Sequence, residues 1–259
     1  MKALYLSALT PHQDVVKGLL SQIKPYGLEV KGHFWTDDLP KMAWMGPRDE
    51  LVDSGTVLWV ILGSKADFEK ATLRYGLSLL CLSAQARKGS PLNILILQNG
   101  TEPVIAGDLP TPLKAADVCS LSDASLGAKL VARAHQPQRF PETEYFIDIL
   151  GNEQIGQWFE IRPAGADSWP GAMFGAAGAE IVFQAVGPAG GLPEKSVLNY
   201  PVQGLTLNLG DLEYSAWAVQ NEISPETSYY AKVDGYPHAI LFGPYSTEAS
   251  AEVHLMTLK

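Results

Sequence analysis

The sequence predicts an α/β domain followed by an all-β domain, and three observations support this. In the first half of the 259-residue chain, apolar strand-like runs alternate with amphipathic helix-like segments. In the second half, short strand-like runs follow one another between Gly- and Pro-rich breaks. The charge changes at the same place, because residues 1–139 hold 15 Lys/Arg and 13 Asp/Glu whereas residues 140–259 hold 4 and 15. We therefore expect domains over 1–136 and 142–259, separated by a linker with flanking prolines.

The first domain opens with a strand, a helix and a second strand. The apolar run 2–9 predicts the first strand. Apolar residues then recur at helical spacing over 12–26, and Gly27 follows as a helix stop. The run 28–35 predicts the second strand.

The rest of the first domain repeats this alternation. The continuous apolar run 56–62 is typical of a strand buried on both faces of a parallel sheet. A long helix is expected over 67–88, a strand over 92–97, a weaker strand over 117–121 and a last helix over 125–135. Strands that alternate with helices give a parallel sheet covered on both faces, so we expect a five-stranded flavodoxin-like domain.

In such sheets, ligands bind beyond the carboxyl ends of the strands, where the strand order switches. Polar or aromatic residues at these ends, together with one Arg on the helix after the third strand, are the candidate ligand-binding residues: Ser7, Thr10, Trp35, Asp37, Asp38, Ser64, Arg74 and Asn99. Trp35 is suited to stacking on a base or to packing under its own loop. The two aspartates are suited to gripping ribose hydroxyls, or they belong to a solvated loop. The chain has neither a Walker A nor a GxGxxG sequence, which argues against a phosphate-cradling enzyme of either class.

Three segments resemble a bacterial TIR-type (Toll/interleukin-1 receptor-type) domain. They are Lys2–Ser7, the run Phe34-Trp35-Thr36-Asp37-Asp38-Leu39-Pro40, and Leu58–Ser64 followed by a helix with Arg74-Tyr75-Gly76. The resemblance covers about the first half of the chain. It implies self-association, or association with another TIR-like domain, through the loop after the second strand, here 35–49. It also implies NAD as a ligand, and many such domains cleave its nicotinamide–ribose bond with a glutamate on the helix after the third strand.

This chain departs from the family at the catalytic position. Arg74 stands where an acidic residue is expected, and a guanidinium stays cationic and accepts no proton. The nearby acids are Asp67 and Glu69, and Glu69 is equally well explained as a solvated carboxylate in the first turn of a helix. We therefore expect a catalytically degenerate signalling and interaction module that binds a nucleotide-type ligand or a protein partner. The alternatives are an NAD or nucleoside N-glycosidic-bond hydrolase that uses Asp67 or Glu69 as a displaced carboxylate, and a structural protein without a small-molecule site.

The second domain consists of seven strand-like runs, which predict a β-sandwich or barrel. The runs are YFIDIL, IGQWFEI, AEIVFQAV, VQGLTLNL, YSAWAV, SYYAKV and HAILFG. The segment 246–258 fits either a closing helix or a further strand. The acidic balance favours a basic partner for this domain.

Composition excludes several classes of protein. A pI near 5.0 argues against nucleic-acid binding, which needs clustered Lys/Arg. The sequence lacks an apolar run long enough to span a membrane, and we expect no secretory signal. Cys81 and Cys119 lack metal-ligand spacing and are expected to be reduced thiols in apolar surroundings, so the predicted compartment is the cytoplasm, with no resident metal or cofactor.

Overall fold

The computed structural model describes residues 2–89, 92–136, 143–245 and 252–259. The chain divides into two compact units, Met1–Phe140 and Pro141–Lys259. The linker expected between 136 and 142 lies outside the described residues.

The N-terminal unit is built on a five-stranded sheet in which all neighbouring strands are parallel. Its strands are β1 (Ala3–Ala8), β2 (Glu29–Phe34), β3 (Thr56–Gly63), β4 (Asn93–Gln98) and β5 (Asp117–Ser120). Their order across the sheet is β2-β1-β3-β4-β5. The chain therefore adds β2 on one side of β1, and β3, β4 and β5 on the other side. The predicted parallel sheet is confirmed.

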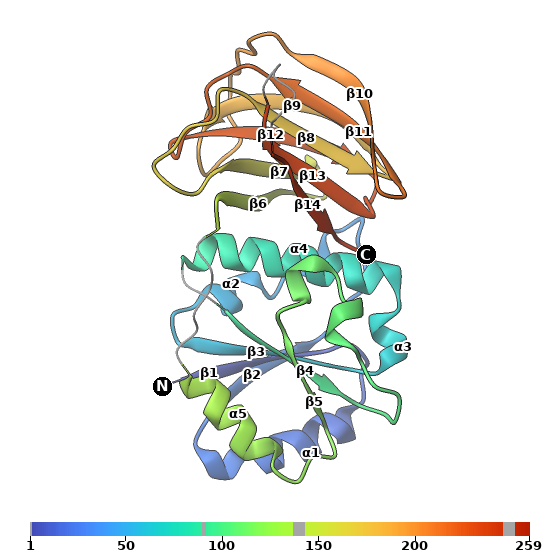
Figure 1. Cartoon of the computed structure of the whole chain (residues 1–259). Helices are drawn as coiled ribbons and strands as arrows, with labels where there is room; N and C mark the ends of the chain where they lie inside the picture. The colour runs from blue at the N-terminus through green and yellow to red at the C-terminus, as the bar shows by residue number, and fades with distance from the viewer. Residues whose placement is uncertain (1, 90–91, 137–142, 246–251) are drawn as a thin grey trace. The chain divides into compact units, whose positions relative to one another are not determined.

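Helices cover both faces of this sheet. They are α1 (Gln13–Ile23), α2 (Arg48–Val52), α3 (Lys65–Phe68), α4 (Ala71–Lys88) and α5 (Leu126–His135), with short 3-10 turns at Lys24–Tyr26, Ala43–Met45, Ala106–Asp108 and Thr111–Leu113. Figure 1 shows α1 and α5 on one face of the sheet and α2 and α4 on the other. β1 and β3 are buried along nearly their whole length, as the apolar runs predict.

The single long helix predicted over 67–88 is wrong, because the structure has two helices there. α3 begins at a capping box, in which the Ser64 side chain accepts from Asp67 N and the Asp67 side chain accepts from Ser64 N. Lys70 is extended (φ −69°, ψ 118°), which turns the chain before α4 begins at Ala71. Asp67 therefore belongs to the short helix next to the strand end rather than to the long helix.

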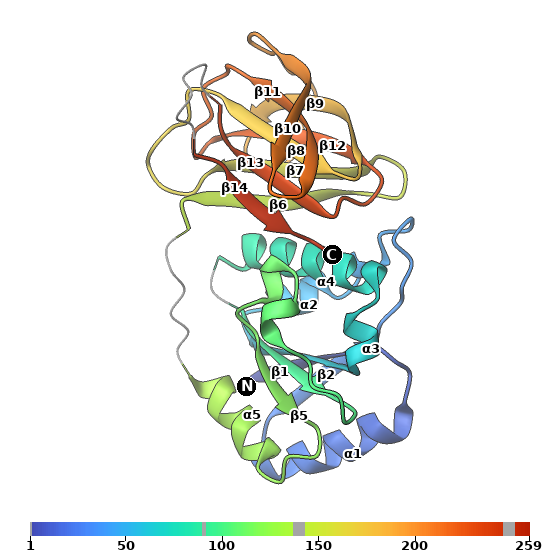
Figure 2. The ribbon, with the colours of Figure 1, turned by 45° about the vertical axis from the view of Figure 1, so that its right-hand side comes forward.

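The C-terminal unit consists of two antiparallel sheets. Its strands are β6 (Tyr145–Asn152), β7 (Gly156–Pro163), β8 (Ala172–Ala177), β9 (Glu180–Pro188), β10 (Val202–Leu209), β11 (Leu212–Val219), β12 (Thr227–Asp234), β13 (Ala239–Pro244) and β14 (His254–Thr257). One sheet has the order β10-β11-β8-β13-β14 and the other β6-β7-β12-β9. Figure 2 shows β10 beside β11 and β14 beside β13. The ring of Phe159 on β7 lies 5.0 Å from that of Phe174 on β8, so the two sheets contact each other through their apolar faces.

Each of the seven predicted runs forms a strand, and two further strands complete the sheets. β8 is missed because its sequence, AMFGAA, consists mainly of Ala and Gly, which have little strand preference. The small residues are needed there, because a Cβ at Gly175 would lie 2.7 Å from Leu241 Cγ on β13. At the C-terminus, β14 pairs with β13, which supports the strand alternative, while 246–251 lie outside the described residues.

Candidate functional site

A pocket of about 250 Å³ lies at the carboxyl ends of β1, β3 and β4. It is lined by Thr10, His12, Val15, Leu62, Gly63, Ser64, Asp67 and Asn99. β2 lies on one side of β1 and β3 on the other, so the strand order switches beside this pocket. Open α/β sheets bind their ligands at such a switch point.

Asp67 organises the floor of the pocket through hydrogen bonds to both carboxylate oxygens. Its Oδ2 accepts from Thr10 Oγ1 (3.0 Å), Ser64 N (3.0 Å) and Ser64 Oγ (2.8 Å). Its Oδ1 accepts from Lys70 Nζ at 2.8 Å. The carboxylate thus ties the loop after β1 to the beginning of α3, and it fixes Thr10 and Ser64 in place.

These bonds also set the charge of Asp67. Burial alone would raise the pKa of this carboxyl, but the hydrogen bonds from Lys70, Ser64 and Thr10 outweigh it and lower the pKa to about 2. The group is therefore ionised at neutral pH and does not donate a proton there.

The structure brings together four of the residues predicted from the sequence: Thr10, Ser64, Asp67 and Asn99. Ser7 is fully buried instead, and its Oγ accepts from Trp59 Nε1 at 2.9 Å, so it packs in the core behind the rim. The sequence reasoning missed His12, an exposed residue at the N-cap position of α1 that lines the pocket. Its position two residues after Thr10, where the first strand gives way to the helix, is the signal that would have found it.

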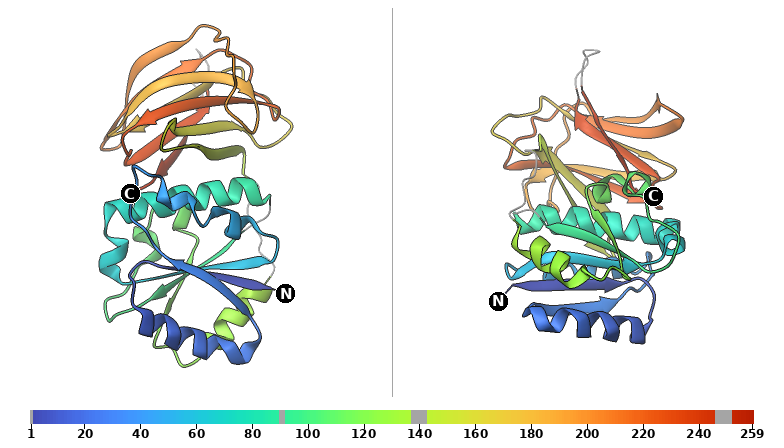
Figure 3. Two further views of the ribbon diagram at one scale, coloured as in Figure 1. Left: turned by 180° about the vertical axis from the view of Figure 1, so that it is seen from behind. Right: turned by 60° about the horizontal axis from the view of Figure 1, so that its bottom comes forward.

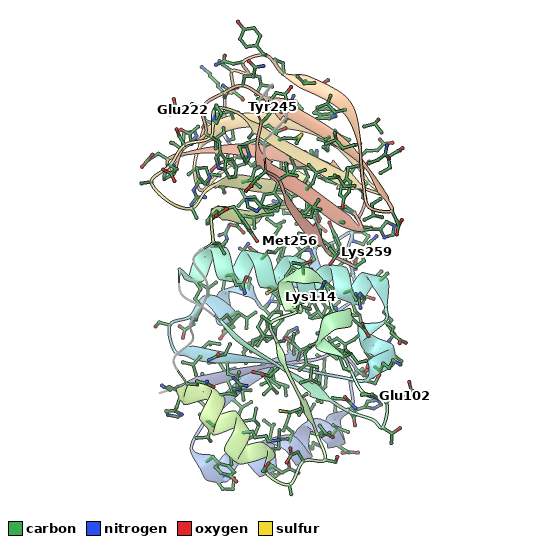
Figure 4. All side chains as sticks on the ribbon, in the orientation of Figure 1. Glu102, Lys114, Glu222, Tyr245, Met256 and Lys259 are labelled. Carbon is green, nitrogen blue, oxygen red and sulfur yellow. The ribbon has the colours of Figure 1, made fainter. Side chains whose placement is uncertain are left out.

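Glu69 and Arg74 are not among the described residues that line this pocket. The Glu69 side chain is 63% exposed and lies 3.8 Å from Lys65 Nζ, which also lies 3.4 Å from Glu102. Figure 4 shows Glu102 on the loop after β4. Arg74 donates to two backbone carbonyls, those of Phe68 (3.2 Å) and Asp108 (2.6 Å), so its guanidinium joins the end of α3 to the 3-10 turn at Ala106–Asp108.

The loop over 35–49 is ordered by its own aspartates. Asp37 Oδ2 accepts from Thr72 Oγ1 at 2.6 Å, which fastens the loop to α4. Asp38 accepts from the backbone N of Lys41 at 3.2 Å and forms an ion pair with the Lys41 side chain, also at 3.2 Å. Neither aspartate is among the described residues that line the pocket at the strand ends.

Both tryptophans of this loop pack near Gly76 on α4. Trp44 is 2% exposed. A Cβ at Gly76 would lie 2.9 Å from Trp35 Cζ2 and 3.5 Å from Trp44 Cβ, so the absence of a side chain admits both residues. The glycine of Arg74-Tyr75-Gly76 thus has a packing role, and the Trp35 ring lies against the helix.

Buried polar groups of the C-terminal unit meet at Glu160, which is fully buried on β7. Its Oε1 accepts from Ser228 Oγ (2.7 Å), Gly190 N (2.8 Å) and Arg162 Nη1 (3.3 Å). Gly190 belongs to the loop after β9, so this carboxylate holds that loop against the sheet.

Neither metal binding nor thiol chemistry is indicated in the part of the chain that the structure describes. No group of three or more His, Cys, Asp or Glu is arranged to hold a metal ion there. Cys81 is buried, which raises its thiol pKa to about 12, and burial also raises the pKa of half-buried Cys119. Among the same residues, no helix has the length and apolar character needed to cross a bilayer.

The sequence was compared with protein families and with curated proteins. No protein-family model matches the chain, and a search of curated proteins gives no match. The resemblance to TIR-type domains therefore stays a prediction from the residues quoted above.

Proposed function

We propose that the N-terminal unit is a flavodoxin-like, TIR-like signalling module that binds a nucleotide-type ligand in the pocket at the ends of β1, β3 and β4. The observation that carries the proposal is the position of this pocket at the switch in strand order, with polar side chains from three strand ends around it.

The chemistry of the lining fits such a ligand. Asn99 offers both an amide donor and a carbonyl acceptor to ribose or base groups. The α1 N-terminus, with His12 at its N-cap and no side-chain cap hydrogen bond, offers backbone N–H groups to a phosphate. Both carboxylate oxygens of Asp67 already accept hydrogen bonds, and the group is negatively charged. We therefore expect a phosphate to bind at the α1 side of the pocket, away from Asp67.

Calorimetric titration with NAD, ADP-ribose and ATP tests this proposal. We expect saturable binding of at least one of them, and weaker binding by about tenfold or more in His12→Ala and Asn99→Ala, since both residues line the pocket and each substitution removes a polar side chain offered to the ligand. Glu102→Gln, a substitution on the loop after β4, is the matched control. Absence of heat with all three ligands would contradict the proposal.

The same module is proposed to self-associate, or to bind another TIR-like domain, through the loop over 35–49. The fastening of this loop by Asp37 and Asp38 supports a fixed surface there. The paired substitution Asp37→Ala and Asp38→Ala should weaken association, as followed by sedimentation. If both association and ligand binding survive the pair, the loop has no such role.

A second candidate function is cleavage of an N-glycosidic bond of NAD or of a nucleoside. The observation in its favour is that the ionised Asp67 lines the pocket, where a negative charge would stabilise an oxocarbenium-like ribose. Incubation with NAD followed by chromatography for nicotinamide tests it. Release that is lost in Asp67→Asn but kept in Glu69→Gln would assign the role to Asp67, and the reverse pattern would assign it to Glu69.

The C-terminal unit is proposed to supply recognition of a basic partner, because residues 140–259 hold 15 acidic and only 4 basic residues. Association that persists unchanged at high salt would contradict an electrostatic basis for that recognition.

A further inference from the structure

We propose that two copies of this chain pair through the open edge of β2, which joins the sheets of their N-terminal units in an antiparallel fashion. This inference goes beyond the proposed function, since it requires neither the ligand pocket nor the loop over 35–49.

The edge of β2 presents free backbone groups. Among the residues that the structure describes, β2 is the outermost strand of its sheet and pairs with β1 on one side only, and Figure 3 shows the sheet from behind with α1 beneath it. Trp35 N–H donates to Ala8 O on β1, and successive residues of a strand alternate in direction. The N–H and C=O groups of Leu28, Val30 and Gly32 therefore point away from β1, where another strand is able to pair with them.

The charges of β2 select one register for pairing with a second copy. Glu29 and Lys31 are exposed residues on the same face of β2, and Glu29 forms no ion pair with another described residue. In an antiparallel pair centred on Val30, Glu29 of each copy lies opposite Lys31 of the other, in positions where the Cα atoms are about 4.5 Å apart.

The neighbouring registers are less favourable. Centring the pair on Lys31 places two lysines opposite each other, and like charges directly opposite are destabilising. Centring the pair on Gly32 places Lys31 opposite His33 of the other copy, so Lys31 no longer lies opposite Glu29. Lys31 already lies 3.0 Å from Glu50 on α2, so in the Val30 register its ammonium would lie between two carboxylates.

An apolar flank beside the edge adds contact area. Leu20 on α1 is 37% exposed and Phe34 on β2 is 39% exposed. A shallow groove of about 290 Å³ runs between α1 and β2 next to these side chains. A two-fold axis brings the same surface of both copies into the interface, so the apolar flanks of the two copies lie against each other beside the paired strands.

Charge reversal in the full-length chain tests the proposal by sedimentation velocity. We expect a dimer of the natural chain, and dimer dissociation constants raised by about tenfold or more in Glu29→Lys and in Lys31→Glu, because each places like charges opposite each other twice. The double variant Glu29→Lys with Lys31→Glu restores opposite charges across the pair, so it should dimerise more tightly than either single variant, although below the natural chain because Lys31→Glu also removes the ion pair with Glu50. Lys195→Glu, on an exposed loop of the C-terminal unit, has the same charge change as Lys31→Glu and should leave the dimer intact. A natural chain that stays monomeric at all concentrations, or a double variant that stays as weak as the single ones, overturns the proposal.

Cysteine pairing tests the register itself, in a Cys119→Ser background that leaves only the buried Cys81. Under mild oxidation, a mixture of the Glu29→Cys and Lys31→Cys chains should give a disulfide-linked dimer, since the opposed Cα atoms lie within disulfide range. Each variant alone should give little. A dimer from Lys31→Cys alone would show the register centred on Lys31 and overturn the one proposed.

Discussion

At the scale of single residues, Asp67 is the group on which the shape of the pocket depends. Its carboxylate fixes Thr10, Ser64 and Lys70 at once. We predict that Asp67→Asn lowers the free energy of unfolding by about 1–3 kcal/mol, because one carboxylate oxygen becomes a donor and the charge is lost. Chemical denaturation measures this change, with Asp49→Asn, whose side chain is 93% exposed, as the control that should stay close to the natural chain.

Asp67 also makes the stability of the protein depend on pH, and its pKa determines the direction of this dependence. The pKa of Asp67 falls from 3.8 in the reference state to about 2 in the fold, so its contribution to stability is present above pH 4 and is lost as the pH falls toward 2. We expect the natural chain to lose stability over this window more steeply than Asp67→Asn does. Parallel slopes in acid denaturation would show that Asp67 is not the responsible group.

Gly76 gives a second prediction at the residue scale. Alanine has the better helix propensity, but its Cβ at this position would lie 2.9 Å from Trp35 Cζ2. We predict that Gly76→Ala lowers the free energy of unfolding by about 1–3 kcal/mol, because the ring has to move. Gly18→Ala in α1 meets nothing within 4 Å and should instead stabilise the unit, by about 0.5–1 kcal/mol. Thermal unfolding checks both predictions: relative to the natural chain, Gly76→Ala should unfold at a lower temperature and Gly18→Ala at a higher one.

At the scale of elements, the loop after β9 depends on the buried carboxylate of Glu160. Gly190 N donates to Glu160 Oε1, and Lys195 lies exposed farther along the same loop. We predict that Glu160→Ala releases the loop and raises trypsin cleavage after Lys195 by about tenfold or more, since local opening exposes the bond. Glu194→Ala removes an exposed carboxylate beside the same bond and serves as the control. Equal cleavage rates in the two variants would show that Glu160 does not hold the loop.

The elements also show what the sequence could predict and what it could not. Apolar periodicity is a local signal, so it identified β1 to β5 and seven strands of the C-terminal unit. The start of α3 was also readable locally, because Ser64-Lys65-Ala66-Asp67 has the spacing of a capping box. β8 was not readable, because its Ala and Gly residues are required by packing against β13, a contact distant in sequence.

The candidate site was predicted only in part for the same reason. The strand ends are marked by local runs, so Thr10, Ser64 and Asn99 were found at the right edge. Whether a side chain faces the pocket depends on partners far along the chain. Ser7 is held by Trp59, and Asp67 by Thr10, contacts that span 52 and 57 residues.

At the scale of the whole molecule, the two units differ in charge as well as in fold. Residues 1–139 carry a net charge of +2 and residues 140–259 a net charge of −11. Self-repulsion among the acidic groups destabilises the C-terminal unit, and salt screens it, since the Debye length falls to about 3 Å at 1 M salt. We therefore predict that calorimetry of the full chain resolves two transitions, of which only one moves to higher temperature as sodium chloride is added.

Fragments 1–136 and 143–259 assign these transitions. Each unit has its own sheets and its own buried clusters, so each fragment should unfold cooperatively. The salt-dependent transition should coincide with that of fragment 143–259, while fragment 1–136 should show little change. Ammonium sulfate would stabilise both units through exclusion from their surfaces, so sodium chloride is the discriminating salt. Equal shifts of both transitions in sodium chloride would show that the charge difference in the sequence does not govern the stability of the acidic unit.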